Sequence, residues 1–308
     1  MSLGRGQESR ASLRSAFIEE FPKLPAPDVP RVVVPQGACD SHAHVFGPWD
    51  RFPLAAERTY TPQETPAKAF ISMLDVVGVE YGVLVQPTVH AVDNSCMLDA
   101  LSLDRRRLRG VAVVSADATF EQLRQMKDAG VEGIRLSDVS DEHGNVQYKN
   151  VVPIEAFVRL KKYLIDLDMH VQFFVEGKAL PKYEQLIRDA QVPIVIDHMG
   201  RPDVREGVNS PHFQTLCRLL SEGLVWIKTT QYRPSKAFPT YDDVRPFFEK
   251  LVSVNPDALV WGSDWPHINM THSIPNPGML LDVLSDWTGD PVVYEKILCS
   301  NPKRLYRL

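Results

Sequence analysis

The sequence predicts an α/β fold, a single (β/α)8 barrel of the TIM type preceded by an N-terminal arm. Eight short apolar, β-branched runs alternate with longer amphipathic stretches, a rhythm typical of parallel βαβ units. Eight such units close into a barrel, and 308 residues suit one barrel of about 250 residues with additional loops. The near-continuous apolar character of the runs agrees, because strands of a parallel barrel are buried on both faces.

The expected strands are short and regularly spaced. They cover residues 38–42, 81–86, 109–114, 133–136, 171–174, 193–197, 224–228 and 258–262. Helical patterns lie between them, for example at residues 121–129, 154–167, 213–222 and 244–252. We expect residues 1–37 to form the arm and residues 38–308 the barrel. Two long connections, 46–66 and 234–241, are predicted to be binding loops or lids.

Composition narrows the classes of partner. Charged residues make up 24% of the chain and the formal net charge is -5, so neither nucleic acid nor an anionic membrane is an expected partner. No apolar run reaches the length of about 18 residues that predicts a membrane span. Residues 1–21 lack the apolar core of a signal peptide. The four cysteines show neither metal nor disulfide spacing, which favours a cytoplasmic location. Homo-oligomerisation stays open.

Polar residues gather at the C-terminal ends of the expected strands, where barrel enzymes carry their chemistry. The residues concerned are Asp40, His42, His44, Gln86, His90, Arg135, Asp197, His198, Lys228, Thr230, Asp264 and His267. This clustering predicts a catalytic site. No Gly-x-Ser-x-Gly segment occurs, so a serine-hydrolase triad has no support.

The first strand supplies two histidines on one side of the chain. His42 and His44 are two residues apart, so both side chains are expected to face the barrel mouth. Two imidazoles there can bind a metal or donate hydrogen bonds to a carbonyl oxygen. The alternative is a pair of structural histidines that cap the strand. Asp40 is expected to orient this pair or the backbone.

Three further strand ends carry candidate residues. Asp264 follows a buried strand, where a carboxylate is costly unless it is paired or poised for proton transfer. A loop cap or ion-pair partner is its alternative. His198, after the sixth strand, is a similar candidate, but a single histidine at a strand end is weaker evidence for a functional role. Arg135 suits bidentate binding of a substrate carboxylate, with an ion pair to Asp138 or Asp141 as its alternative. Trp265 and His267 are expected to support the loop.

Four segments resemble the amidohydrolase superfamily. They are DSHAHVFGP at 40–48, ERTYTP at 57–62, IDHMGRPD at 196–203 and WGSDWPH at 261–267. They are particularly similar to the 2-pyrone-4,6-dicarboxylate hydrolase branch, whose relatives act on muconolactones and sugar lactones. The resemblance runs from about residue 36 to Leu308. It implies the (β/α)8 barrel and a lactonase, a carboxylic ester hydrolase, that works without metal.

The resemblance also implies roles for the candidate residues. Asp264 would take a proton from water as this water attacks the lactone carbonyl. His42, His44 and His198 would polarise the carbonyl and stabilise the tetrahedral oxyanion.

The substrate would be a small lactone with an anionic group. The residues that match substrate-binding positions of the family are Arg135, Tyr60, Arg233 and, in the loop after the second strand, His90.

Two departures from the branch concern its substrate. The branch carries a second arginine six residues after the position of Arg135, where this chain has Asp141. It also has a tyrosine near the end of strand five, where we align Phe173. Losing a cation and gaining an acid disfavours a second carboxylate on the substrate. A monoanionic or neutral lactone is therefore expected.

Zinc-dependent members of the superfamily add a histidine on strand five or a carboxylated lysine on strand four. Segments 133–136 and 171–174 contain neither, and His170 lies at the wrong end of its strand. We therefore expect no required cofactor. One divalent metal such as zinc, held by His42, His44 and Asp264, is the alternative.

Other functions would require a different metal content or different residues at these positions. A zinc-dependent decarboxylase or amide hydrolase of the superfamily would need stoichiometric metal. Isomerase relatives drop part of the histidine pair and the strand-eight aspartate, which this chain keeps. A non-catalytic barrel binding protein would have lost the base or the carbonyl-polarising histidines.

Overall fold

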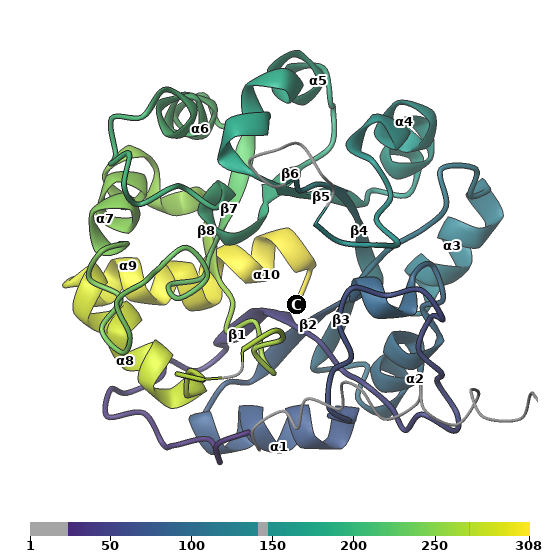
Figure 1. Cartoon of the computed structure of the whole chain (residues 1–308), viewed down its shortest axis with the longest axis horizontal. Coiled ribbons are helices and arrows are strands. Elements are labelled where there is room, and N and C mark those ends of the chain that lie inside the picture. Colours follow the sequence, from purple (N-terminus) through teal and green to yellow (C-terminus); the bar gives the residue numbers. More distant parts are fainter. Residues whose placement is uncertain (1–23, 141–146, 271) are drawn as a thin grey trace, which may run out of the picture.

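The computed structural model describes residues 24–140, 147–270 and 272–308, and it confirms the predicted barrel (Figure 1). Eight parallel strands are hydrogen-bonded in chain order from β1 to β8. Their bounds are β1 (Cys39–Ala43), β2 (Tyr81–Val85), β3 (Leu108–Ala112), β4 (Val131–Asp138), β5 (His170–Val175), β6 (Ile194–Ile196), β7 (Val225–Thr229) and β8 (Leu259–Trp261). Each one overlaps a predicted strand.

Helices surround the strands (Figure 1). The α-helices are α1 (Ala67–Val77), α2 (Ser95–Leu103), α3 (Phe120–Asp128), α4 (Phe157–Asp166), α5 (Glu184–Arg188), α6 (Pro211–Ser221), α7 (Arg245–Val254), α8 (Pro277–Thr288), α9 (Pro291–Glu295) and α10 (Asn301–Tyr306). Shorter helical segments are η1 (Thr88–His90), η2 (Ile154–Ala156), η3 (Gly177–Tyr183), η4 (Asp197–Gly200), η5 (Pro256–Ala258) and η6 (Lys296–Ser300). No helix among the described residues is both long and apolar enough to cross a membrane.

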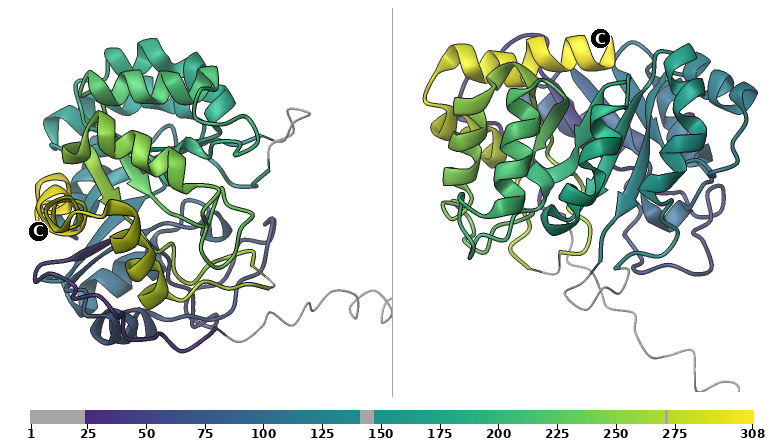
Figure 2. Two further views of the ribbon diagram at one scale, coloured as in Figure 1. Left: turned by 90° about the vertical axis from the view of Figure 1, so that its left-hand side faces the viewer. Right: turned by 90° about the horizontal axis from the view of Figure 1, so that it is seen from above.

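The core has two layers. The larger layer lies between the strands and the outer helices, and a smaller one fills the barrel interior around Val83, Val111 and Val195. Leu305 and Tyr306 of α10 join the inner layer, so this helix covers the N-terminal end of the barrel. Figure 2 (right) shows α10 across one end of the barrel and the long connecting loops at the opposite end. The end with the loops is therefore the end of the barrel that α10 does not cover.

The described part of the arm packs against α8. The backbone amides of Arg31 and Val32 donate to the carboxylate of Asp282 at 2.8 and 3.1 Å, and the Arg31 side chain pairs with the same group at 2.9 Å. The arm thus follows the outside of the barrel near its last helices. The four cysteines are all buried free thiols.

The barrel closes between β1 and the chain that follows β8. The amide of Asp264 donates to the His42 carbonyl oxygen at 2.8 Å, and the amide of His44 donates to the Trp265 carbonyl oxygen at 2.8 Å. The buried carboxylate of Asp40 accepts the amide and the hydroxyl of Ser263. Asp40 therefore binds backbone across this β1–β8 seam, in line with the expectation from sequence. The seam brings the strand-one histidines beside Asp264.

The seam leaves no room for a side chain at Gly262. A Cβ atom at this position would lie 2.5 Å from the Cβ of His42. We predict that Gly262→Ala lowers the free energy of unfolding by about 1–3 kcal/mol, the usual cost of overpacking, and also displaces His42. Urea denaturation and activity per folded molecule measure the two effects.

Gly223→Ala is the control for this variant. A Cβ at Gly223 meets no atom within 4 Å, but the backbone φ of +72° disfavours a side chain. The control should lose stability without losing activity per folded molecule. Full activity of folded Gly262→Ala would contradict a steric effect on the site.

Candidate active site

Six of the eight candidate residues line one cavity at the C-terminal end of the barrel. They are His44, Tyr60, Arg135, His198, Arg233 and Asp264. His42 is fully buried directly beneath them. The structure thus brings together residues from β1, the first long loop, β4, η4 and the segments after β7 and β8.

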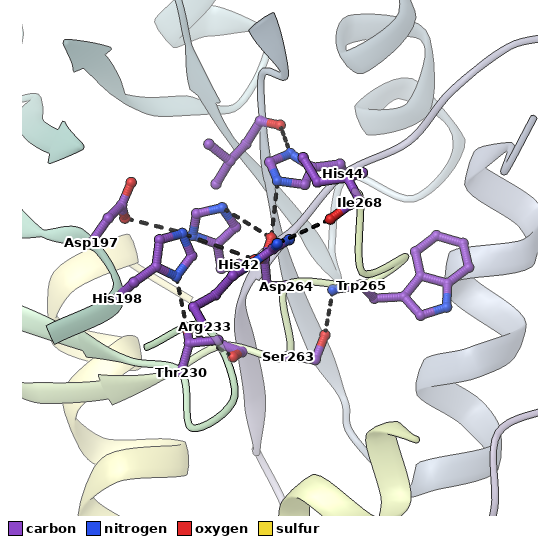
Figure 3. A network of polar contacts seen from close by, with 12 residues as sticks. His42, His44, Asp197, His198, Thr230, Arg233, Ser263, Asp264, Trp265 and Ile268 are labelled. Atoms are coloured by element: carbon purple, nitrogen blue, oxygen red, sulfur yellow. Dashed lines mark hydrogen bonds and ion pairs between the residues drawn. The ribbon is translucent and has the colours of Figure 1, made fainter. Parts of the chain in front are cut away.

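Asp264 lies at the centre of this group (Figure 3). Its Oδ1 atom is 3.1 Å from Nε2 of His44 and 3.7 Å from Nε2 of His42. Its Oδ2 atom accepts hydrogen bonds from the Tyr232 hydroxyl at 3.2 Å and from Nε of Arg233. Burial alone raises the pKa of Asp264, but the Arg233 guanidinium, with His198 and His44, holds this pKa well below its usual range. The carboxylate is therefore ionised at neutral pH.

Each of the three imidazoles directs its Nδ1 atom to an acceptor outside the group. Nδ1 of His44 donates to the Val85 carbonyl oxygen at 2.7 Å. The Thr230 hydroxyl donates to the Gly262 carbonyl oxygen, so its oxygen is free to accept from Nδ1 of His198 at 3.1 Å. These contacts place the single proton of a neutral ring on Nδ1.

His42 repeats this orientation with a carboxylate. Its Nδ1 atom is 3.5 Å from Oδ1 of Asp197. Neither ring nitrogen of this fully buried side chain has a hydrogen-bond partner of good geometry among the described residues. Burial lowers the pKa of His42 well below its ordinary value and that of His198 to about 3, so both rings are neutral at pH 7.

The Nε2 atoms of the three rings lie toward Asp264, and that of His44 is within hydrogen-bond distance of its Oδ1 atom (Figure 3). This pattern suits a divalent cation, because histidine ligands use one ring nitrogen and donate the other N–H to a neighbouring acceptor. His42, His44 and Asp264 offer ligand atoms that all lie within 4.8 Å of one another. Two imidazole nitrogens and a carboxylate oxygen, with water, are an ordinary ligand set for catalytic zinc. The residues present fit such an ion.

Arg135 is anchored by an acid that the sequence did not suggest. Its guanidinium pairs with Oδ2 of Asp197 at 2.8 Å, and the partner expected at Asp138 is not used. Asp138 instead accepts the Tyr183 hydroxyl, and Asp141 lies outside the described residues. Asp197 follows β6, which lies two strands beyond β4 and so faces Arg135 across the barrel interior.

A buried lysine and a glutamine complete this network. Nζ of Lys228 donates to Oε1 of Gln172 at 2.8 Å and lies 3.5 Å from Oδ1 of Asp197. Nε2 of Gln172 donates to Oδ2 of Asp197 at 2.9 Å. Burial lowers the pKa of Lys228 to about 8. The network fixes the carboxylate that faces His42 and, at the same time, the guanidinium that faces the cavity.

Arg233 and Tyr60 occupy different positions in the cavity wall. Arg233 contacts Asp264 and donates to the Ile268 carbonyl oxygen at 3.0 Å, so part of its guanidinium holds the carboxylate. The Tyr60 hydroxyl is buried and lacks a hydrogen-bond partner of good geometry among the described residues. An unsatisfied buried hydroxyl at a cavity is a donor available to a ligand.

Two residues from the sequence analysis do not face the cavity. His90 is buried among aromatic rings, 6.2 Å from Phe46 and 6.4 Å from Trp49 between ring centres, and does not line the cavity. Phe173 packs against Phe157 of α4, because successive side chains of a strand point to opposite sides. The strand-five side chain that lines the cavity is Phe174.

Lys228 was named at a strand end but was given no role, and Tyr232 and Arg201 were not among the predicted site residues. A lysine inside an apolar strand was a usable signal for Lys228. Arg201 follows His198 within a segment that carries the family resemblance. Tyr232 had no signal, because side-chain direction in a loop does not follow from spacing. His267 supports Tyr232, with Nδ1 lying 3.3 Å from the hydroxyl.

The barrel and the imidazole–carboxylate cluster at its mouth together define an amidohydrolase-type site. The chain belongs to the amidohydrolase family, whose model matches residues 39–308. It is 38% identical over 276 residues to a 4-sulfomuconolactone hydrolase of Rhizobium radiobacter, covering 89% of this chain and 91% of that protein.

Two further relatives have related names. A 2-pyrone-4,6-dicarboxylate hydrolase of Comamonas testosteroni is 33% identical over 306 residues, covering 94% of this chain and 98% of that protein. The crystal structure of a probable 2-pyrone-4,6-dicarboxylic acid hydrolase from Acinetobacter baumannii, with citric acid bound, has a TM-score of 0.76 at 26% identity. This match covers 88% of this chain and 100% of that chain.

Buried neutral histidines predict acid sensitivity. Burial lowers the pKa values of His170, His198 and His267 to about 3, whereas an unfolded histidine titrates near 6.5. The unfolded chain therefore binds more protons below about pH 6.5, and stability falls as the pH drops from there toward 3. Each ring contributes a slope of up to about 1.4 kcal/mol per pH unit. Urea unfolding at pH 7, 6 and 5 measures this slope.

His170→Phe is the variant for this test. His170 lies at the N-terminal end of β5, away from the cavity, with its ring 5.4 Å from that of Tyr306. Between pH 6 and 5, the slope of the free energy of unfolding against pH should be smaller in this variant, by the equivalent of about one bound proton. An unchanged slope would show that His170 already titrates normally in the folded protein.

Proposed function

We propose that this protein is a hydrolase that opens a small anionic lactone. The observation that carries the proposal is the ionised Asp264 carboxylate, held by Arg233 and Tyr232 on one oxygen and facing His42 and His44 with the other. Relatives named as lactone hydrolases, aligned over about nine-tenths of the chain, support this substrate class.

Asp264 acts as the general base. A water molecule beside its carboxylate attacks the lactone carbonyl carbon and transfers a proton to Asp264, which gives a tetrahedral intermediate. The bond from this carbon to the ring oxygen then breaks, and the proton on Asp264 passes to the leaving oxygen. The products are a carboxylic acid, which ionises by releasing its proton to solvent, and a hydroxyl group on one open chain. Arg233 and Tyr232 orient the base throughout.

The cavity wall selects an anionic substrate. Tyr60 offers its unsatisfied hydroxyl, and Arg135 and Arg233 place positive charge nearby. A guanidinium binds a carboxylate through two parallel hydrogen bonds, which fixes both position and orientation. A lactone with one anionic group is thereby held with its carbonyl toward the imidazoles.

One divalent cation is also part of the proposal, held by His42, His44 and Asp264. When bound, such an ion supplies Lewis acidity that polarises the carbonyl. The sequence favoured a metal-free enzyme in which the imidazoles donate hydrogen bonds to the carbonyl. That role needs a proton on Nε2, whereas the contact of Nδ1 with Thr230 favours a lone pair on Nε2 of His198.

Replacement of the base tests the mechanism. We predict that Asp264→Asn lowers kcat on the preferred lactone by about 10³-fold or more while the fold is retained. Asparagine suits the test because Asp264 has a φ of 55°, in the left-handed region that asparagine tolerates. Steady-state kinetics and circular dichroism check the two parts. Asp166→Asn in α4 is the control. Near-normal turnover by Asp264→Asn would exclude Asp264 as the general base.

Metal content tests the second part of the proposal. We expect about one divalent ion per chain by elemental analysis, loss of activity after chelation, and recovery with added zinc. His42→Asn should lower the ion content. A fully active protein without metal would instead support the metal-free lactonase, and would require a proton on Nε2 of at least one histidine. Turnover of amides or decarboxylation by the loaded protein, without lactone opening, would point to the other superfamily activities.

A further inference from the structure

We infer that Asn150 is a positioning residue that ties three loops together at the mouth of the cavity and so holds Tyr60 and Tyr148 in the cavity wall. Through these two tyrosines, Asn150 determines how tightly the substrate binds, while the reacting groups keep their places. This inference deepens the proposed function, because it concerns substrate binding in the same site, and it rests on that proposal.

Tyr148 contributes an aromatic ring to the cavity wall. It lines the same cavity as Tyr60 and Phe174, and its ring centre lies 5.6 Å from that of Phe174 at an interplanar angle of 51°. Burial raises the pKa of the Tyr60 hydroxyl above its ordinary value, and the nearby Tyr148 adds to this shift. A tyrosine offers a flat apolar face and a hydroxyl group to a small ring. Tyr148 is therefore placed to contact a substrate together with Tyr60.

The side chain of Asn150 connects segments that are far apart in the sequence. Its Nδ2 atom donates to the carbonyl oxygen of Glu57, in the long loop after β1, at 2.6 Å. The same atom donates to the carbonyl oxygen of Thr88, in η1 after β2, at 3.3 Å. A side-chain amide has two N–H donors, so it serves both acceptors. Asn150 thereby joins the loop after β4 to the loops after β1 and β2.

The residue before Asn150 adds a second connection between the same loops. The backbone amide of Lys149 donates to the Thr59 hydroxyl at 2.8 Å, and its Nζ atom lies 3.4 Å from the Glu57 carboxylate. Thr59 directly precedes Tyr60, and Lys149 directly follows Tyr148. These contacts therefore hold the backbone next to each tyrosine. We call the group of contacting residues the loop clasp: Glu57, Thr59, Thr88, Lys149 and Asn150.

The backbone around Asn150 suits this role. Asn150 has a φ of 62°, in the left-handed region that asparagine tolerates better than most residues. On either side of the clasp the chain is tied back to β4 and its end, by hydrogen bonds from the Gln147 amide to the Val139 carbonyl oxygen at 3.0 Å and from the Ser137 amide to the Val152 carbonyl oxygen at 2.8 Å. The clasp then fixes the tip of the loop between these two anchors.

The clasp is separate from the contacts that position the reacting groups. Asp264 and His44 are held by backbone hydrogen bonds of the β1–β8 seam, in which no residue of the clasp takes part. Loss of the clasp should let Tyr60 and Tyr148 sample more orientations, and the cost of ordering them again would then fall on substrate binding. The expected effect is therefore on KM and not on kcat.

Asn150→Gly tests the clasp, because glycine keeps the left-handed backbone without strain and removes both side-chain hydrogen bonds. The substrate is the lactone that the wild-type protein opens fastest among 2-pyrone-4,6-dicarboxylate, a muconolactone and a sugar lactone. We expect KM to rise about fivefold and kcat to stay within about twofold. Thr59→Val removes the acceptor of the Lys149 amide at nearly the same shape and should raise KM about threefold.

Hydrogen exchange measures the clasp without any substrate. Amides within residues 57–60 and 147–150 should exchange faster in Asn150→Gly and Thr59→Val, while those of β1 and β8 keep their wild-type rates. Gln191→Gly is the matched control. Gln191 is an exposed residue with a φ of 60°, and it precedes β6 at the opposite end of the barrel. This control should change neither KM nor exchange in the two loops.

An unchanged KM in folded Asn150→Gly, or a fall in kcat as large as the rise in KM, would overturn the inference. Faster exchange that extends to β1 and β8 would overturn it as well, because it would indicate a general loss of stability. If the wild-type protein opens no lactone, the proposed function fails, and calorimetry with benzoate, a flat ring with one carboxylate, tests the clasp instead. Benzoate binding weakened about fivefold in Asn150→Gly supports the inference, and equal affinities refute it.

Discussion

The arrangement of the site depends on the hydrogen bonds of the β1–β8 seam. Asp264 donates its amide to His42, and His44 donates its amide to Trp265, so the residues that closed the barrel are also those that carry the chemistry. Asp40 adds a buried carboxylate that holds the backbone of Ser263. Because backbone contacts set these positions, the carboxylate and the two histidines keep their spacing without support from flexible loops. This explains how a site of several polar groups stays ordered at the end of an apolar barrel.

The buried charges around the cavity come in matched pairs. Arg135 pairs with Asp197, and Arg233 pairs with Asp264, while the imidazoles of His42 and His198 are neutral at pH 7. Such pairs contribute little net stability, since desolvation of both partners offsets their attraction. They are better explained by positioning: each acid fixes a guanidinium in one orientation before a ligand arrives. The cost of ordering these long side chains is then met during folding rather than during binding.

For physical reasons, the sequence was sufficient to predict the fold and to name six residues that the structure brings to one cavity. Apolar runs mark strands buried on both faces, and polar residues directly after them mark the functional end of a parallel barrel, which located Asp264, His44 and His198. The sequence was insufficient to predict which side chains pair with each other across the barrel interior. Asp197 is the partner of Arg135 because side chains of β4 and β6 point inward at the same height, a relation that local spacing does not contain. Phe173 was aligned with a tyrosine of the related branch from resemblance alone. The structure shows that Phe174 is the strand-five side chain that lines the cavity, and strand alternation does not reveal which face looks inward.

The four residues from His198 to Arg201 have φ values between 47° and 69°, and this left-handed turn links two tasks. Any substitution that relaxes its backbone would move an imidazole near Asp264 together with a guanidinium at the cavity wall. One short backbone segment therefore sets the positions of both side chains at the cavity. Variation in substrate among proteins that retain the turn is expected to arise elsewhere, in the loops after β1, β4 and β7, where a residue can change without displacing an imidazole.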